Sequence, residues 1–229
     1  MKKLFNIKIT ELKPADLFEK LSRHAHLNLE NHGLYDLTFE DNKISGFFWA
    51  REAVVVPNEL DLHTLGEPLT FYKLNRFEFS LKHINKYEYL LTISSSSRSI
   101  KPLLKLLQET TGTKVFVSQI EISLTSLIHQ IEKVSSAPIE ITHAYASNQV
   151  LSKSEKITFS VYSTENAINA AQKTITGTTI KFDRIRLRTS HEGTILTLDI
   201  KSNCLYSISE SSSEIEKILE RYVLSTQEE

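Results

Sequence analysis

The sequence predicts an α+β protein with two similar halves, in which a mainly antiparallel, saddle-like sheet has its helices on one face. Several segments alternate apolar and polar residues, as half-buried strands do, and others repeat apolar residues with helical spacing. The segments YKLNRFEFSL at 72–81 and IKFDRIRLRT at 180–189 share one pattern. In both halves a strand, a serine run and a helix come last. These matches predict one structural unit that is used twice.

The first predicted repeat spans 1–112 and the second spans 113–229. Each is expected to follow the order β-α-β-β-(α)-β-β-α, with the boundary in the segment TTGTK at 110–114. The two echoing segments lose strict alternation at the same place, which predicts a β-bulge at Asn75 and at Asp183. Because any two α+β units share apolar periodicity, a chance likeness is the alternative to duplication.

In the first half, LFNIKIT at 4–10 alternates and predicts a strand. A helix is expected from Pro14, since proline suits the first helical turn and an apolar stripe follows it. YDLTF and ISGFFWA predict a hairpin around the polar turn EDNK at 40–43. The segment at 50–68 is less regular and stands where the second half has an extra helix.

In the second half, VFVSQIEIS at 115–123 predicts a strand, followed by a helix that Ser123 caps. Two alternating segments at 139–151 and 156–163 predict a hairpin. TENAINAAQKTI predicts the extra helix at about 164–175, with Gly177 as its C-terminal stop. The HEG segment suits a turn between the last long strands, and a final helix follows the second serine run.

The composition is that of a globular chain, with 40% hydrophobic and 24% charged residues. No apolar run approaches the ~18–20 residues of a membrane helix, so we expect no membrane association. The N-terminus alternates, which favours a strand over a signal peptide. We therefore expect a soluble, cytoplasmic protein. It is expected to be monomeric by default, because two copies within one chain already mimic a dimer.

One strand face carries a row of basic residues. Alternation places Phe77, Ile185 and Leu187 toward the helices and the basic side chains on the open face. The candidate binding residues are Arg76, Lys82, Arg184, Arg186 and Arg188. Three of these arginines recur at ~6.6–6.8 Å steps along one strand, near the ~7 Å phosphate repeat of nucleic acid. The alternative is an ordinary charged surface, neutralised by cross-strand pairs with Asp183, Glu192 and Asp199.

No motif for catalysis, cofactor binding or metal binding is present, so none of these sites is predicted. The sequence has no phosphate loop, no dinucleotide-binding glycine pattern, no serine nucleophile elbow and no paired-histidine zinc helix. Cys204, the single cysteine, excludes an internal disulfide and suits a buried apolar position better than a nucleophile. The serine runs at 94–97 and 211–213 suit helix capping, with anion binding as the alternative.

Three local patterns have both a structural and a functional interpretation. His24, His26 and His32 suit a solvated helix end that favours the imidazolium, with a loop metal site as the alternative. Asp36, Asp41 and Lys43 suit a hairpin turn better than a nuclease site. Phe47, Phe48 and Trp49 are consecutive, so their rings point to opposite strand faces. Burial of both faces is expected, and base stacking by an exposed ring is the alternative.

The functional prediction is a non-enzymatic binding or scaffold subunit of a larger assembly. It would dock a protein partner through the sheet face or through the acidic C-terminal helix with Glu214, Glu216 and Glu220. The alternative is a DNA- or RNA-binding module that uses the basic open face. The net charge of −1 does not favour it, since basic residues number 15 against 14 acidic ones in 1–112 and 12 against 14 in 113–229. An enzyme whose pocket joins distant residues is the third hypothesis.

Overall fold

The structure is a computed structural model. It describes residues 1–10, 12–25, 31–61, 64–94, 100–134, 137–151, 154–175, 179–191, 194–209 and 213–226. Within these ranges the chain is α+β, with eleven strands and five helices, and the strands form an open, antiparallel sheet. This confirms the predicted fold class. None of the described helices is both long and apolar enough to cross a bilayer.

The chain divides into two compact units. The N-terminal unit is Phe5–Ser118, and the C-terminal unit joins Met1–Leu4 to Gln119–Glu229. Strand β1, Lys2–Ile9, contributes to both, because its neighbours are β5 and β11. The compact units thus divide six residues after the boundary expected from the sequence, and the first four residues go with the second unit.

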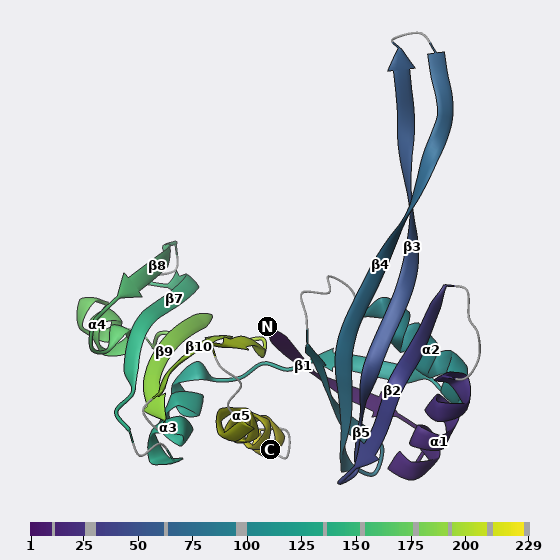
Figure 1. Cartoon of the computed structure of the whole chain (residues 1–229). Coiled ribbons are helices and arrows are strands. Elements are labelled where there is room, and N and C mark those ends of the chain that lie inside the picture. The colour runs from purple at the N-terminus through teal and green to yellow at the C-terminus, as the bar shows by residue number, and fades with distance from the viewer. Residues whose placement is uncertain are drawn as a thin grey trace. The chain divides into compact units, whose positions relative to one another are not determined.

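The N-terminal unit has the strand order β2-β3-β4-β5-β1, and β6 also pairs with β1. Its further strands are β2 His32–Glu40, β3 Lys43–Asp61, β4 Thr64–Asn85, β5 Glu88–Ser94 and β6 Val115–Gln119. Helices α1, Pro14–Ala25, and α2, Lys101–Thr111, lie against this sheet (Figure 1). Leu17 and Leu107 from the helices join Phe48 and Phe79 from the strands in one buried core. Burial of these apolar side chains stabilises the unit.

Local turn chemistry explains the β2–β3 hairpin. Asp41 and Asn42 both have positive φ, 49° and 58°, as a type I′ turn requires, and Glu40 pairs with Lys43 across it. Asp36 also has positive φ, 51°, where the β2–β3 register shifts between Tyr35 and Thr38. The predicted hairpin turn is therefore present.

The C-terminal unit has the strand order β11-β10-β9-β7-β8. Its strands are β7 Glu140–Val150, β8 Lys156–Tyr162, β9 Arg184–His191, β10 Thr194–Lys201 and β11 Leu205–Ile208. Its helices are α3 Leu124–Val134, α4 Ala167–Thr174 and α5 Ser213–Ser225. Ile185 and Leu187 of β9 are buried, as are Leu127 of α3 and Leu219 of α5. The core of this unit thus lies on the helix-covered side of β9, as the sequence predicts.

Helix ends follow the expected chemistry. Pro14 begins α1, and the Ser126 N–H donates to Ser123 Oγ before α3. Gly112 ends α2 with φ 69°, the left-handed conformation that suits glycine. Asn166 caps the extra helix α4, which occupies Ala167–Thr174 of the predicted 164–175. Gly177, its predicted stop, lies outside the described residues.

The two predicted bulges are wrong. The β3–β4 register runs without a shift from Val56/Leu69 to Lys43/Lys82, so β4 is regular at Asn75. Alternation breaks there because β4 leaves a two-stranded segment, where no core selects one apolar face, and enters the sheet. Asp183 precedes β9, whose pairing with β10 is regular from Arg184.

The duplication is not confirmed. The hairpins that the sequence aligns occupy different places in their sheets. In the N-terminal unit β2 is the edge strand and β3 continues into β4, whereas in the C-terminal unit β8 is the edge strand and β7 pairs with β9. Shared apolar periodicity is enough to produce the likeness of the two segments.

Candidate functional site

The most distinctive feature of the molecule is a two-stranded arm. We define the arm as residues 51–61 of β3 and 64–74 of β4, which pair with each other from Arg51/Leu74 to Asp61/Thr64. Among the described strands, neither segment has another partner. Eleven residues at ~3.3 Å each give the arm a length of about 36 Å. Figure 1 shows it leaving the rest of the N-terminal unit as a twisted ribbon.

The arm exposes apolar side chains on both of its faces. Cross-strand partners share a face, so Val54 lies with Phe71 on one side, and Val55 lies on the other. The apolar residues of the arm that are 40–63% exposed are Val54, Val55, Val56, Leu69, Phe71, Tyr72 and Leu74. These residues form a group of neighbouring exposed apolar side chains, whereas single exposed apolar residues are ordinary on a protein surface.

The backbone edges of the arm are exposed as well as its apolar side chains. An isolated two-stranded ribbon is only marginally stable in water, and both outer edges of this one lack a strand partner among the described residues. Natural proteins cover, charge or shorten such edges to avoid unwanted pairing. A long apolar arm that is left open is therefore suited to being covered by a binding partner.

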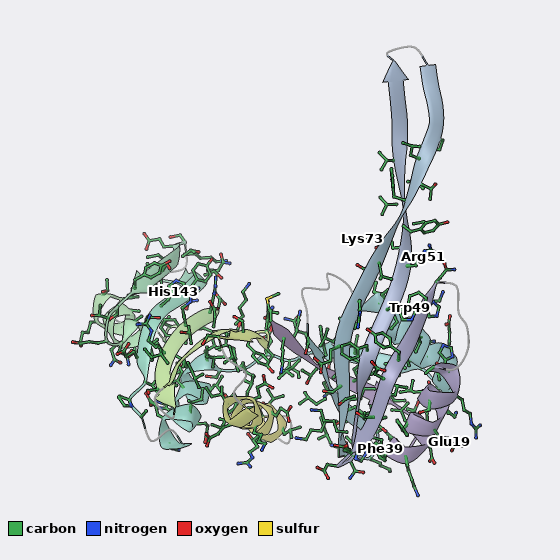
Figure 2. All side chains as sticks on the ribbon, viewed as in Figure 1. Glu19, Phe39, Trp49, Arg51, Lys73 and His143 are labelled. Carbon is green, nitrogen blue, oxygen red and sulfur yellow. The ribbon has the colours of Figure 1, made fainter. Side chains whose placement is uncertain are left out.

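Aromatic rings and arginines meet at the base of the arm on the open face of the sheet. Tyr35 stacks on Phe47 with 5.1 Å between ring centroids, and the Arg76 guanidinium lies 4.9 Å from the Tyr35 centroid. Arg51 lies 4.4 Å from the Tyr72 centroid. Trp49 is cross-strand to Arg76, and Arg51 follows Trp49 two residues later on the same face of β3 (Figure 2). Such cation–π groups are common at protein interfaces.

The three consecutive aromatic residues of β3 point alternately to opposite faces of the sheet, as strand geometry requires. Phe48 is fully buried in the core, whereas Phe47 and Trp49 are half-buried on the opposite face. The expectation that both faces are fully buried is therefore wrong. Of the helices that the structure describes in this unit, α1 and α2 pack against the sheet, and they share one core on the Phe48 side.

The predicted basic row is present, but it is partly neutralised within the sheet. Arg184, Arg186 and Arg188 alternate with buried residues along β9, as predicted. Arg184 donates from Nε and Nη2 to the two oxygens of Asp199 at 2.7 and 2.6 Å. Arg186 donates to Asp199 Oδ2 at 2.9 and 3.1 Å, and Arg188 lies 4.0 Å from Glu140. These pairs reduce the charge that the row offers to a polyanion.

Burial alone would raise the pKa of Asp199, but hydrogen bonds and charge from Arg184 and Arg186 hold it below the ordinary value. Asp199 is therefore ionised at neutral pH and binds both arginines firmly. Asp183, a second predicted counter-ion, instead accepts hydrogen bonds from Ser147 N and Oγ at 2.6 Å each. Glu192 lies outside the described residues.

The remaining predicted binding residues, Arg76 and Lys82, lie in the N-terminal unit. Both are on the open face of β4, six positions apart, which corresponds to ~20 Å along a strand. Arg76 belongs to the aromatic group at the arm base, and Lys82 lies opposite Lys43. The structure therefore brings Arg184 and Arg186 together on one carboxylate, and it separates Arg76 from Lys82.

Other predicted features have structural roles. Cys204 is buried, which raises the pKa of its thiol to about 12 and confirms the apolar interpretation. Burial and the charge of His32 lower the pKa of His24, so the expected imidazolium is disfavoured. Lys2 Nζ donates to both carboxylate oxygens of Glu216 at 2.6 and 2.7 Å, so this acidic residue of α5 already has a partner within the chain. His26 and most of both serine runs lie outside the described residues.

Sequence reasoning missed the arm. Its signals were three consecutive valines at 54–56 and renewed alternation from Leu69. Pro57 concealed them, since proline inside a strand argues against a regular ladder. The structure accommodates Pro57 where the β3–β4 register shifts between Val56 and Asn58.

No known protein family has a model that matches this chain, and no curated protein sequence matches it. Its function must therefore be inferred from the geometry of the chain alone.

Proposed function

We propose that this protein is a non-enzymatic binding subunit that docks a partner protein through the arm. The observation that carries the proposal is the exposure of seven large apolar side chains on both faces of a two-stranded ribbon. Full burial of an exposed side chain of this size contributes about 1.5–3 kcal/mol, and the part still exposed here contributes roughly half of that for each residue. A partner that covers several of them therefore gains substantial binding free energy. The aromatic and arginine group at the arm base extends this surface onto the sheet.

The charge of the arm favours one class of partner. The two segments that form the arm have four acidic residues and two basic ones, which are Glu52, Glu59, Asp61 and Glu67 against Arg51 and Lys73. Because the arm segments have a net negative charge, two arms would repel each other, and an arm would also repel a nucleic-acid backbone. We therefore infer a different protein with an apolar cleft and basic residues at its rim. Pairing of the β9 arginines with Asp199 also favours this hypothesis over nucleic-acid binding.

The test starts from a photo-crosslinking amino acid placed at Tyr72 of the full chain, in the cells that produce the protein. The captured protein is then purified, and its affinity for the unmodified chain is measured by calorimetry. We expect saturable binding that the double substitution Leu69→Ser/Phe71→Ser weakens at least tenfold, because two exposed apolar anchors are removed.

A matched control is the double substitution Phe116→Ser/Val117→Ser. These residues of β6 are also exposed, at 57% and 41%, but lie outside the arm. Equal weakening by both double variants would refute docking through the arm. Sedimentation velocity provides a second check, since a dimer that Leu69→Ser/Phe71→Ser dissociates would make the partner a second copy of this chain.

A further inference from the structure

The C-terminal unit has a pocket of about 340 Å³ between β7, the start of β9 and the turn that joins β10 to β11. We propose that this pocket binds a small oxyanion, a phosphate or carboxylate group, through Arg184 and Lys201. The volume suits a small ligand, since pockets for small molecules begin at about 300 Å³. This inference does not depend on the arm or on its partner.

The sheet concentrates positive charge at the pocket. Register places Lys201 directly opposite Arg184, and like charges that face each other across two strands destabilise the pair. Lys201 forms no ion pair with any residue that the structure describes, and Asp199 is shared by Arg184 and Arg186. Arg184, Lys201 and Asp183 line the pocket. With Arg186 and Asp199, which are cross-strand partners on β9 and β10, three cations stand against two carboxylates in this part of the sheet. A bound anion would relieve the repulsion between Arg184 and Lys201.

Suitable donors remain available. Arg184 uses Nε and Nη2 for Asp199, which leaves Nη1 with its two N–H groups. Asn203 also lines the pocket, and its Oδ1 accepts from the Leu205 N–H, which leaves the side-chain NH₂ to donate. A guanidinium edge, a mobile ammonium and an amide form a donor set that matches an oxyanion.

His143 forms one wall of the pocket and offers a reporter. The residue is only 7% exposed, its ring stacks on Tyr162 with 4.4 Å between centroids, and its Nε2 lies 2.6 Å from Ser160 Oγ. Its Nδ1 has no hydrogen-bond partner among the described residues. Burial, together with the charges of Arg184 and Arg186, lowers the pKa of His143, against the opposing effect of Asp199. An anion in the pocket offsets the arginine charges, so binding raises this pKa.

The experiment is a titration of the full chain, labelled with ¹⁵N-histidine, with inorganic phosphate at constant ionic strength. The His143→Gln variant assigns the resonance. We expect a saturable shift of the His143 signal and a rise of its pKa. Lys201→Gln is expected to weaken binding about tenfold, as loss of one charge-assisted contact does. Lys173→Gln on α4, which changes an exposed lysine outside the pocket lining, is expected to leave the affinity unchanged.

Several outcomes would overturn the proposal. One is the lack of a saturable shift of the His143 signal at ~10 mM phosphate, a concentration about ten times a weak Kd of ~1 mM. Another is equal weakening by Lys201→Gln and Lys173→Gln, which would indicate general screening. Titrations with methyl phosphate and acetate distinguish phosphate from carboxylate ligands. Binding of a single-stranded oligonucleotide that is tighter per phosphate and steeply salt-dependent would assign the site to nucleic acid instead.

Discussion

At the residue scale, Gly33 and Trp49 form a contact that only glycine allows. A Cβ at position 33 would lie 2.7 Å from Trp49 Nε1 and 3.1 Å from Cε2, closer than side-chain carbons approach. We expect Gly33→Ala to displace the indole and to lower the free energy of unfolding by about 1–3 kcal/mol, as overpacking does. Trp49 is the single tryptophan, so its fluorescence maximum should also move. Urea unfolding followed by tryptophan emission measures both effects.

Gly112→Ala is the matched control. Gly112 has φ 69°, but no atom lies within 4 Å of its would-be Cβ. The alanine should cost about 1 kcal/mol through backbone strain alone and leave the emission of the native state unchanged. If Gly33→Ala leaves both stability and native emission unchanged, the indole does not lie against β2 as described.

Alternation along the chain predicts which residues of a strand are buried. It correctly places Ile185 and Leu187 in the core and the three arginines that alternate with them on the open face. It does not predict which carboxylate those arginines bind. Asp199 reaches Arg184 and Arg186 because β10 pairs with β9 in one particular register. Register depends on long-range pairing, whereas alternation reports only the face on which a side chain lies.

At the element scale, the arm should be dispensable for folding. The core of the N-terminal unit contains Phe48 and Phe77, but none of the arm side chains that the structure describes. Glu52 and Lys73 are cross-strand partners, so replacing 53–72 with Asn-Gly closes the same ladder through a two-residue turn. We expect the melting temperature to change by less than about 4 °C, the effect of ~1 kcal/mol, while binding of a hydrophobic dye decreases. Calorimetry and dye fluorescence measure the two quantities.

A large loss of stability in the shortened chain would contradict this division between core and arm.

Sequence reasoning found the strands that enclose the core, because one buried face imposes alternation on them. It missed the arm because neither face of the arm packs against the described helices, so its apolar residues follow no single periodicity. Features that serve a partner rather than the core are the ones that periodicity within one chain describes least well.

At the scale of the whole molecule, the two-unit division follows from pairings that local patterns do not reveal. The sequence predicts two halves at 1–112 and 113–229. In the structure, the first four residues belong to the C-terminal unit and not to the N-terminal one. Lys2 pairs with Tyr206 and Lys3 with Leu205, more than 200 positions along the chain. A strand that alternates at the N-terminus carries no local sign of such a distant partner.

The N-terminal residues should therefore stabilise the C-terminal unit. Removal of residues 2–4 deletes two β1–β11 pairings, the fully buried Leu4 and the ion pair between Lys2 and Glu216. We expect this to destabilise the C-terminal unit by about 3–5 kcal/mol, mainly through loss of Leu4. Hydrogen exchange of the amides in β10 and β11 should accelerate about 100-fold or more, while β3 and β4 within the sheet of the N-terminal unit exchange as before.

The Lys2→Gln variant measures the contribution of the ion pair to stability without changing the β1–β11 strand pairing. Lys2 and Glu216 are partly exposed, so this substitution should cost less than about 1 kcal/mol and accelerate exchange only slightly. Equal acceleration in both units after removal of 2–4 would mean that the chain unfolds as one cooperative body. Unchanged exchange in β10 and β11 would mean that the β1–β11 pairing contributes no stability. The predicted result, acceleration in one unit alone, requires that the three residues removed near the N-terminus contribute their stabilising free energy to the C-terminal unit.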